Sequence, residues 1–112
     1  MDGESVAVGW TTFEDRESAD EFARKLIERR VAACVQIDPP MQSVYSWKGR
    51  TCVDEEIRMW IKTTVKQAET MTEFLEQEHP YETPQWVWAR AGGVFPTYGE
   101  WVLESVTDDG DA

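Results

Sequence analysis

The chain has 112 residues, of which 41% are hydrophobic and 12% aromatic, so it is long enough for one domain and too apolar to be disordered. Twenty-two acidic against eleven basic side chains give a net charge of −11, which argues against a nucleic acid or an anionic lipid surface as partner. No apolar run approaches the roughly 18 residues of a membrane span. The acidic start lacks the layout of a secretory signal, so we expect a cytoplasmic protein without a membrane partner.

The first elements are a strand and a helix. Val6, Val8 and Trp10 alternate with smaller residues, which predicts a strand. Asp15 is the expected N-cap of the helix that follows. The helix has a stripe at spacings of three and four that should face a sheet. That stripe consists of Ala19, Phe22, Ala23, Leu26, Ile27 and Arg30.

Alternation returns at residues 31–37 and places Cys34 on the face away from the helices. Pro39-Pro40 should then break the hydrogen bonding of an edge strand. Residues 43–47 are predicted as a strand that ends in a turn at residues 48–50. The longest strand signal covers residues 53–64. Its core face carries Ile57, Met59 and Ile61, and its other face carries Glu56, Arg58, Trp60 and Lys62.

The last third of the chain contains two capping boxes. The first, Thr64–Gln67, opens a helix that must end at about His79, because Pro80 and Pro84 cannot continue it. Residues 86–91 alternate as a strand. The second box, Thr97–Glu100, opens a short terminal helix that presents Tyr98 and Trp101.

This order of elements predicts an α+β fold of the ferredoxin-like (βαββαβ) type with a short C-terminal helix. We expect a single domain, with a core at about residues 5–106 and an acidic tail at 107–112. In such a fold both helices cover one face of the sheet. The second face should carry Arg58, Trp60 and Lys62, with Trp86 and Trp88 or the residues that alternate with them. So much aromatic surface predicts an oligomer.

Five stretches in order resemble the CutA divalent-cation-tolerance family and together cover about positions 5 to 106. They are RVAACV at 30–35, VYSWKG at 44–49, EEI at 55–57 running to IKTT at 61–64, HPYETP at 79–84, and YGEW at 98–101. The resemblance implies a ferredoxin-like fold that assembles as a tight homotrimer. It also implies similarity to the PII signal-transduction proteins, whose clefts between subunits bind small effectors.

The function implied by the resemblance is tolerance or binding of divalent metal ions, copper in particular. Copper-binding proposals in the family use a cysteine at the end of the first strand and a pair of histidines before the Pro-Tyr. Here Trp10 and Glu78 occupy two of these positions, which leaves His79. The candidate ligands of a copper or zinc ion are His79 and Cys34. Cys34 has either a metal or redox role or the role of a small packed thiol. The alternative is a trimer that binds a small effector or serves as a platform without any metal role.

Each candidate residue also has a structural interpretation. His79, with Glu78 or Glu82 beside it, is either a ligand or a helix C-terminal residue that interacts with free carbonyls. Tyr45 and Trp47 either pack in an interface or stack on a ligand. Other residues expected at the cleft or interface are Trp60, Lys62, Tyr81, Glu82, Tyr98 and Trp101. Lys62 either meets an anionic ligand or pairs with carboxylates, and Tyr81 should pack the hinge.

We expect no enzymatic activity. The single histidine has no nucleophile motif around it, so a catalytic triad is not indicated. The chain has no glycine-rich phosphate loop. It also has no asparagine to position water for acyl phosphate hydrolysis, a reaction that the ferredoxin-like fold supports.

Overall fold

A computed structural model of the chain describes residues 5–106, so the acidic tail predicted at 107–112 lies outside the described residues. The elements run β1 (Val6–Phe13), α1 (Arg16–Glu28), β2 (Cys34–Ile37), β3 (Met41–Trp47), β4 (Arg50–Thr64), α2 (Val65–Glu78), β5 (Val87–Arg90) and α3 (Pro96–Ser105). Every strand and helix expected from the sequence is present, and the fold is a mixed α+β fold.

The sheet is antiparallel and is organised around β4 and β1. Its strand order is β2-β4-β1-β5, and β3 pairs with the other half of β4. β2 lies opposite residues 59–62 of β4, and β3 lies opposite residues 50–56. The break between β2 and β3 falls at Asp38–Pro40, as the two prolines predicted.

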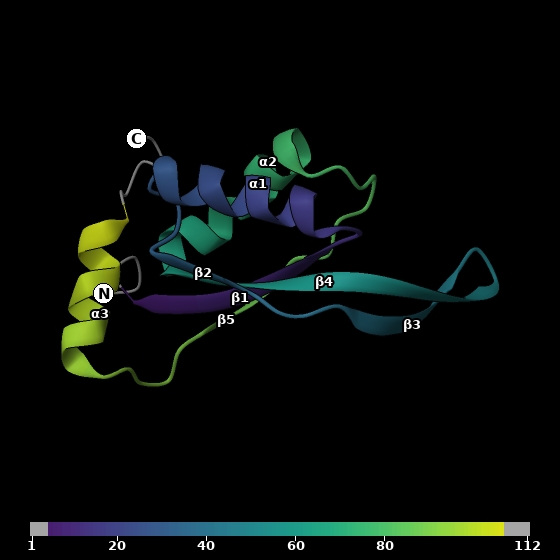
Figure 1. Cartoon of the computed structure of the whole chain (residues 1–112). Coiled ribbons are helices and arrows are strands. Elements are labelled where there is room, and N and C mark those ends of the chain that lie inside the picture. Colours follow the sequence, from purple (N-terminus) through teal and green to yellow (C-terminus); the bar gives the residue numbers. More distant parts are fainter. Residues whose placement is uncertain (1–4, 107–112) are drawn as a thin grey trace.

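The β3–β4 hairpin projects beyond the part of the sheet that the helices cover (Figure 1). It turns through Lys48 and Gly49, which both have positive φ (52° and 77°). Two such residues between paired strands form the tight turn whose twist matches that of the strands. Because the turn fixes the register, Tyr45 lies opposite Cys52 and Val44 opposite Val53.

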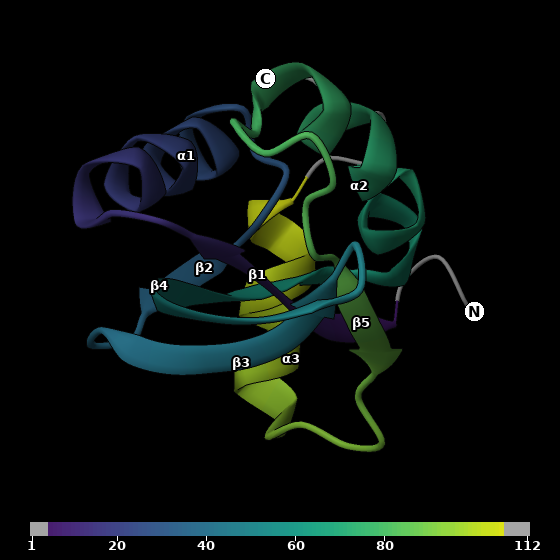
Figure 2. The ribbon, with the colours of Figure 1, turned by 90° about the vertical axis from the view of Figure 1, so that its right-hand side faces the viewer.

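Helices α1 and α2 lie side by side on one face of the sheet (Figure 2). The Asp15 carboxylate accepts a hydrogen bond from the Ser18 amide (2.7 Å), and the Thr64 hydroxyl accepts one from the Gln67 amide (3.2 Å). Both predicted N-caps are therefore confirmed. The main core lies between these helices and the sheet. Its most buried large side chains include Phe13, Leu26, Met59, Ile61 and Met71.

The structure corrects two residues of the stripe predicted for α1, Ile27 and Arg30. The chain leaves the helix through Arg30, whose φ is +57°, and β2 starts only at Cys34. Ile27, in the last turn of α1, is 44% exposed instead of buried. The Arg30 guanidinium turns away from the core and donates to the carbonyls of Glu104 (2.7 Å) and Ser105 (3.2 Å). It thereby caps the C-terminal end of α3.

Of the two alternatives for the second face, Trp86 and Trp88 or the residues that alternate with them, the structure has the second. Both rings pack on the helix side against Ala7, Val65 and Ala68. The Trp86 indole N–H donates to the Ala68 carbonyl (3.3 Å). Their alternate Val87 faces the other way, opposite Trp10 in the register, and is 44% exposed.

Helix α3 stands across the end of the sheet remote from the hairpin and extends past the face opposite α1 and α2 (Figures 1 and 2). It begins at Pro96 after Phe95, without a side-chain cap, so the capping box predicted at Thr97 is wrong. Proline suits the first helical position because the amide it lacks would be unpaired there. Val102 of α3 is fully buried, so α3 covers this end of the second face. We call this second face the open face.

Candidate functional site

The open face carries an aromatic and charged row at its centre. Trp10 and Trp60 lie opposite each other in the register with ring centroids 5.1 Å apart. Asp38 accepts hydrogen bonds from the Arg58 guanidinium (2.8 Å) and the Trp60 indole (3.0 Å). The hydrogen bond from Arg58 has the larger effect and that from Trp60 the smaller, and both lower the pKa of Asp38. The row is thus fixed in place by strand pairing and by one shared carboxylate.

Lys62 lies further along the same row, near α3. Its ammonium donates to the Gln36 side-chain carbonyl (2.8 Å) and lies 5.9 Å from the centroid of the Tyr98 ring. Cys34 is opposite Lys62 in the register and half-buried, on the face predicted for it. Trp101 is 45% exposed, and its ring lies 5.6 Å from that of Tyr98.

A groove of about 790 Å³ lies between the hairpin and residues 81–85. Three aromatic side chains line it: Tyr45, Trp47 and Tyr81. Five carboxylates also line it, from the end of β1, from β4 and from the segment after α2: Glu14, Asp54, Glu55, Glu56 and Glu82. We refer to this feature as the acidic groove. The structure therefore brings the predicted residues Tyr45, Trp47, Tyr81 and Glu82 together in one place.

Two tyrosines fix carboxylates in the acidic groove. The Tyr45 hydroxyl donates to Asp54, and this bond raises the pKa of Tyr45 to about 12. The Tyr81 hydroxyl donates to Glu56 (3.1 Å), and burial together with this bond raises the pKa of Tyr81. The Tyr81 bond ties the proline-flanked segment to the root of the hairpin.

Sequence reasoning missed four of the five groove carboxylates, all except Glu82. One signal was available for part of the set. A two-residue turn at Lys48-Gly49 pairs Ser43 with Asp54 and Met41 with Glu56, so these two acids share a hairpin face with Tyr45 and Trp47. Glu14 reaches the groove only through the tertiary fold.

His79 is buried beneath this site and both of its ring nitrogens are hydrogen-bonded. Nε2 donates to the Thr12 carbonyl (2.9 Å), and Nδ1 accepts from the Tyr81 amide (3.1 Å). A backbone carbonyl on one nitrogen and an N–H on the other require the neutral ring protonated at Nε2. Burial lowers the pKa of His79, and the ring stacks on Phe13 at 4.2 Å. Neither nitrogen has a lone pair left for an ion.

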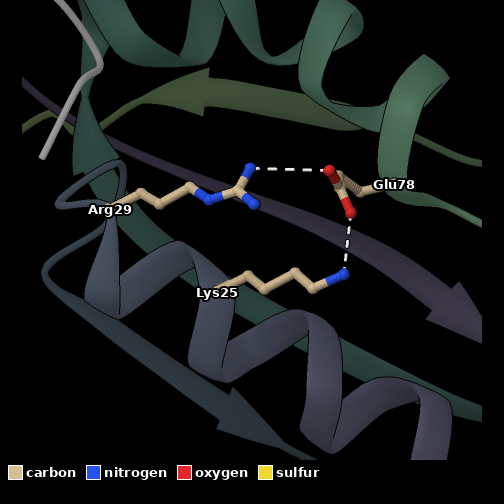
Figure 3. A network of polar contacts seen from close by, with 3 residues as sticks. All are labelled: Lys25, Arg29 and Glu78. Atoms are coloured by element: carbon tan, nitrogen blue, oxygen red, sulfur yellow. Dashed lines mark hydrogen bonds and ion pairs between the residues drawn. The ribbon is translucent and has the colours of Figure 1, made fainter.

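Glu78 pairs with two cations at the C-terminal end of α1, Lys25 in its last turn and the C-cap residue Arg29 (Figure 3). Its carboxylate oxygens lie 2.8 Å from the Lys25 ammonium and 3.5 Å from the Arg29 guanidinium. The hydrogen bond from Lys25, reinforced by both charges, lowers the pKa of Glu78. This contact joins the C-terminal end of α2 to the last turn of α1.

We expect Glu78→Gln to lower the free energy of unfolding by about 1 kcal/mol at pH 7, since the cations are half-exposed and solvent weakens such pairs. The measurement is urea denaturation at a fixed subunit concentration. Glu76→Gln is the matched control because Glu76 is an exposed carboxylate on the same helix turn. Equal urea midpoints for the two variants would show that the pairing contributes no stability.

The residues do not fit a copper or zinc ion held within one subunit. His79 lies against Thr12, which pairs with Arg58, whereas Cys34 pairs with Lys62. The two candidate ligands are thus four positions apart along β4, about 13 Å at the usual rise of a strand. Among residues 5–106, no group of three or more His, Cys, Asp or Glu side chains is arranged to hold a metal ion. Glu78 and Trp10 have structural partners instead.

The fold and the site define a small α+β protein whose open sheet face and projecting hairpin carry aromatic surface. A family profile described as CutA1 divalent ion tolerance protein matches residues 7–105. The chain belongs to this family, as the motifs at 30–35, 44–49, 55–64, 79–84 and 98–101 indicated.

Relatives from distant organisms share the family's sequence and fold. The chain is 37% identical over 111 residues to Protein CutA of Mus musculus, covering 96% of this chain and 63% of that protein. It is 37% identical over 97 residues to the Divalent-cation tolerance protein CutA of Thermotoga maritima, covering 87% and 95%. The crystal structure of CutA1 from Oryza sativa superposes with a TM-score of 0.89 at 30% identity, covering 93% of this chain and 95% of that one.

The chain spans less than two thirds of the length of the mouse and human relatives, 63% and 60%. Within residues 5–106, none of the helices combines the length and the apolar character needed to cross a bilayer.

Proposed function

We propose that this protein acts in divalent-ion tolerance as a cytoplasmic, non-enzymatic homotrimer whose clefts between subunits bind small ligands. The observation that carries the proposal is apolar surface that a lone subunit leaves in water. On the hairpin, Val44 and Val53 are opposite each other and 62% and 57% exposed. Burying such surface against further copies is favourable.

Two further features support the proposal. The sheet order β5-β1-β4-β2, with β3 continuing β2, supports the ferredoxin-like arrangement. A closed ring of three needs two different surfaces that fit each other, because its contacts are head-to-tail. The hairpin and the open face with Trp60 and Val87 are two such surfaces.

The hairpin has two faces with different roles in this proposal. Val44 and Val53 point to one face, which we assign to the contact between subunits. Tyr45 and Trp47 line the groove on the other face, which we assign to the cleft. Direct contact with divalent ions then falls to exposed carboxylates and is weak, because no convergent ligand set holds an ion within the described residues.

Native mass spectrometry of the protein with and without stoichiometric copper or zinc tests the proposal. We expect a trimer that retains no fixed number of ions after buffer exchange. A monomer at micromolar concentration would contradict the assembly, and a trimer with a whole number of ions per subunit would contradict the weak-contact assignment.

Trp60→Ala should weaken the trimer by about 2 kcal/mol per contact, since large aromatic side chains dominate well-packed interfaces. Sedimentation velocity over a dilution series measures this as a shift of the trimer–monomer transition to higher concentration. Ile27→Ala is the control, because Ile27 is exposed on the helix layer. A Trp60→Ala trimer with the wild-type transition would show that the open face is not part of the interface.

A further inference from the structure

We infer that the acidic groove binds a linear organic polycation, in which ammonium groups are separated by methylene chains, as in a polyamine. The inference deepens the proposed function and rests on its assignment of this groove to the cleft. It starts from the aromatic walls, which are unusual on a surface. Tyr45 and Trp47 remain 42% and 45% exposed, and with Tyr81 they surround a hollow of about 790 Å³.

The charge of the residues that line the groove favours a cationic ligand. Five carboxylates line the groove, and its lining contains no lysine, arginine or histidine. Two of them, Asp54 and Glu56, are fixed by tyrosine hydroxyls, and each carboxylate has a second oxygen that can accept from a ligand. A cation is therefore complementary to this groove, and an anion is repelled by it.

The separation of the carboxylates favours an extended ligand with several charges over a compact ion. A compact divalent ion needs several oxygens converging at about 2 to 2.6 Å. No three of the described carboxylates, cysteines and histidine are arranged in that way. The acids instead come from β1's end, from successive positions of β4, and from Glu82. A chain with separated charges can reach several of them at once.

The aromatic side chains of the groove favour an organic cation over a metal ion. Cationic groups and their adjoining methylenes are attracted to the faces of tryptophan and tyrosine, whereas a hydrated metal ion gains little from them. Trp47 is 45% exposed, so its ring is accessible to such a cationic group. The exposed Lys48 ammonium lies over the ring, 5.9 Å from its centroid. A polyamine in the groove would compete with Lys48 for that ring.

Isothermal titration calorimetry with spermidine at 150 mM NaCl and pH 7.5 tests the inference. We expect saturable binding that is about fivefold weaker in Trp47→Ala, from loss of the aromatic face. Glu82→Gln should weaken it about threefold, from loss of one exposed charge. Trp47→Phe keeps an aromatic ring and should bind within twofold of wild type.

Glu69→Gln is the matched control, because Glu69 is an exposed carboxylate on α2 and its loss changes the net charge by the same amount as Glu82→Gln. We expect its spermidine affinity to equal that of wild type. Absence of saturable heat, or equal weakening by Glu69→Gln and Glu82→Gln, would overturn the inference, since only diffuse attraction would remain. Magnesium chloride at the same ionic strength should give no saturable heat, and magnesium binding as tight as spermidine would also overturn it.

Native mass spectrometry of the same samples separates this inference from the proposed assembly. Spermidine binding with the expected variant pattern by a monomer would support the ligand class and contradict the homotrimer. A trimer that binds no spermidine would contradict the ligand class and leave the assembly supported.

Discussion

His79→Ala is expected to lower the free energy of unfolding by about 4 kcal/mol, in the range found for truncating buried aromatic side chains. The ring is only 7% exposed and stacks on Phe13 at 4.2 Å. Its removal leaves a cavity. It also leaves two backbone groups, the Thr12 carbonyl and the Tyr81 amide, without the hydrogen-bond partner that His79 provides. Guanidinium denaturation at pH 7.5 and one subunit concentration measures the loss, because the stability of an oligomer depends on concentration.

His79→Phe separates packing from hydrogen bonding. It retains a ring that can stack on Phe13 and removes only the two nitrogen contacts, so we expect about 2 kcal/mol of the loss. A His79→Phe protein as stable as wild type would show that these two bonds do not stabilise the fold. Copper and zinc isotherms should be the same for wild type and His79→Ala. Weaker ion binding in the variant would return His79 to the metal site.

The pH dependence of stability gives an independent test of the neutral ring. Burial lowers the pKa of His79 below the value of an unfolded histidine, about 6.5. The unfolded state therefore binds a proton at higher pH than the folded state does. The contribution of His79 is fully present above about pH 6.5 and is lost as the pH falls from there through the folded pKa. His79→Phe should lack this loss between pH 6.5 and 5.

Local chemistry explains why much of the fold was predictable. Caps at Asp15 and Thr64, the proline break after Ile37 and the helix end at His79 each depend on residues within four positions of one another. The alternation in β4 correctly separated Ile57, Met59 and Ile61 from Arg58, Trp60 and Lys62.

Errors and open alternatives arose where the outcome depends on distant residues. Alternation showed that Trp86 and Trp88 share a face, but only the register with Gly9 on β1 decides which face that is. The spacing of Ile27 and Arg30 fits a buried stripe, yet Ile27 is exposed in the last turn of α1, and Arg30 lies beyond the end of α1, where Val31 donates to the Leu26 carbonyl. The hydrogen bond from His79 to the Thr12 carbonyl joins residues 67 positions apart, so no local sequence pattern indicates it.

Gly9→Ala is expected to lower the free energy of unfolding by about 3 kcal/mol, the upper part of the usual range for overpacking. A Cβ atom at Gly9 would lie 2.5 and 2.8 Å from two carbons of the Trp86 ring and 2.8 Å from the Val87 carbonyl oxygen. The ring is held by its bond to Ala68 and packs against both helix-side clusters, so it cannot move away at low cost. Thermal and urea denaturation measure the loss.

Gly92→Ala is the matched control, because a Cβ there meets nothing within 4 Å and its φ is not in the left-handed region. We expect it to be neutral or to stabilise by about 0.5 kcal/mol through the unfolded chain. Adding Trp86→Phe removes the outer ring carbons that the new Cβ would strike. The two changes should therefore couple, with Gly9→Ala costing less in the Trp86→Phe background than alone. Additive losses would show that the backbone contact with Val87, and not the indole, requires glycine at this position.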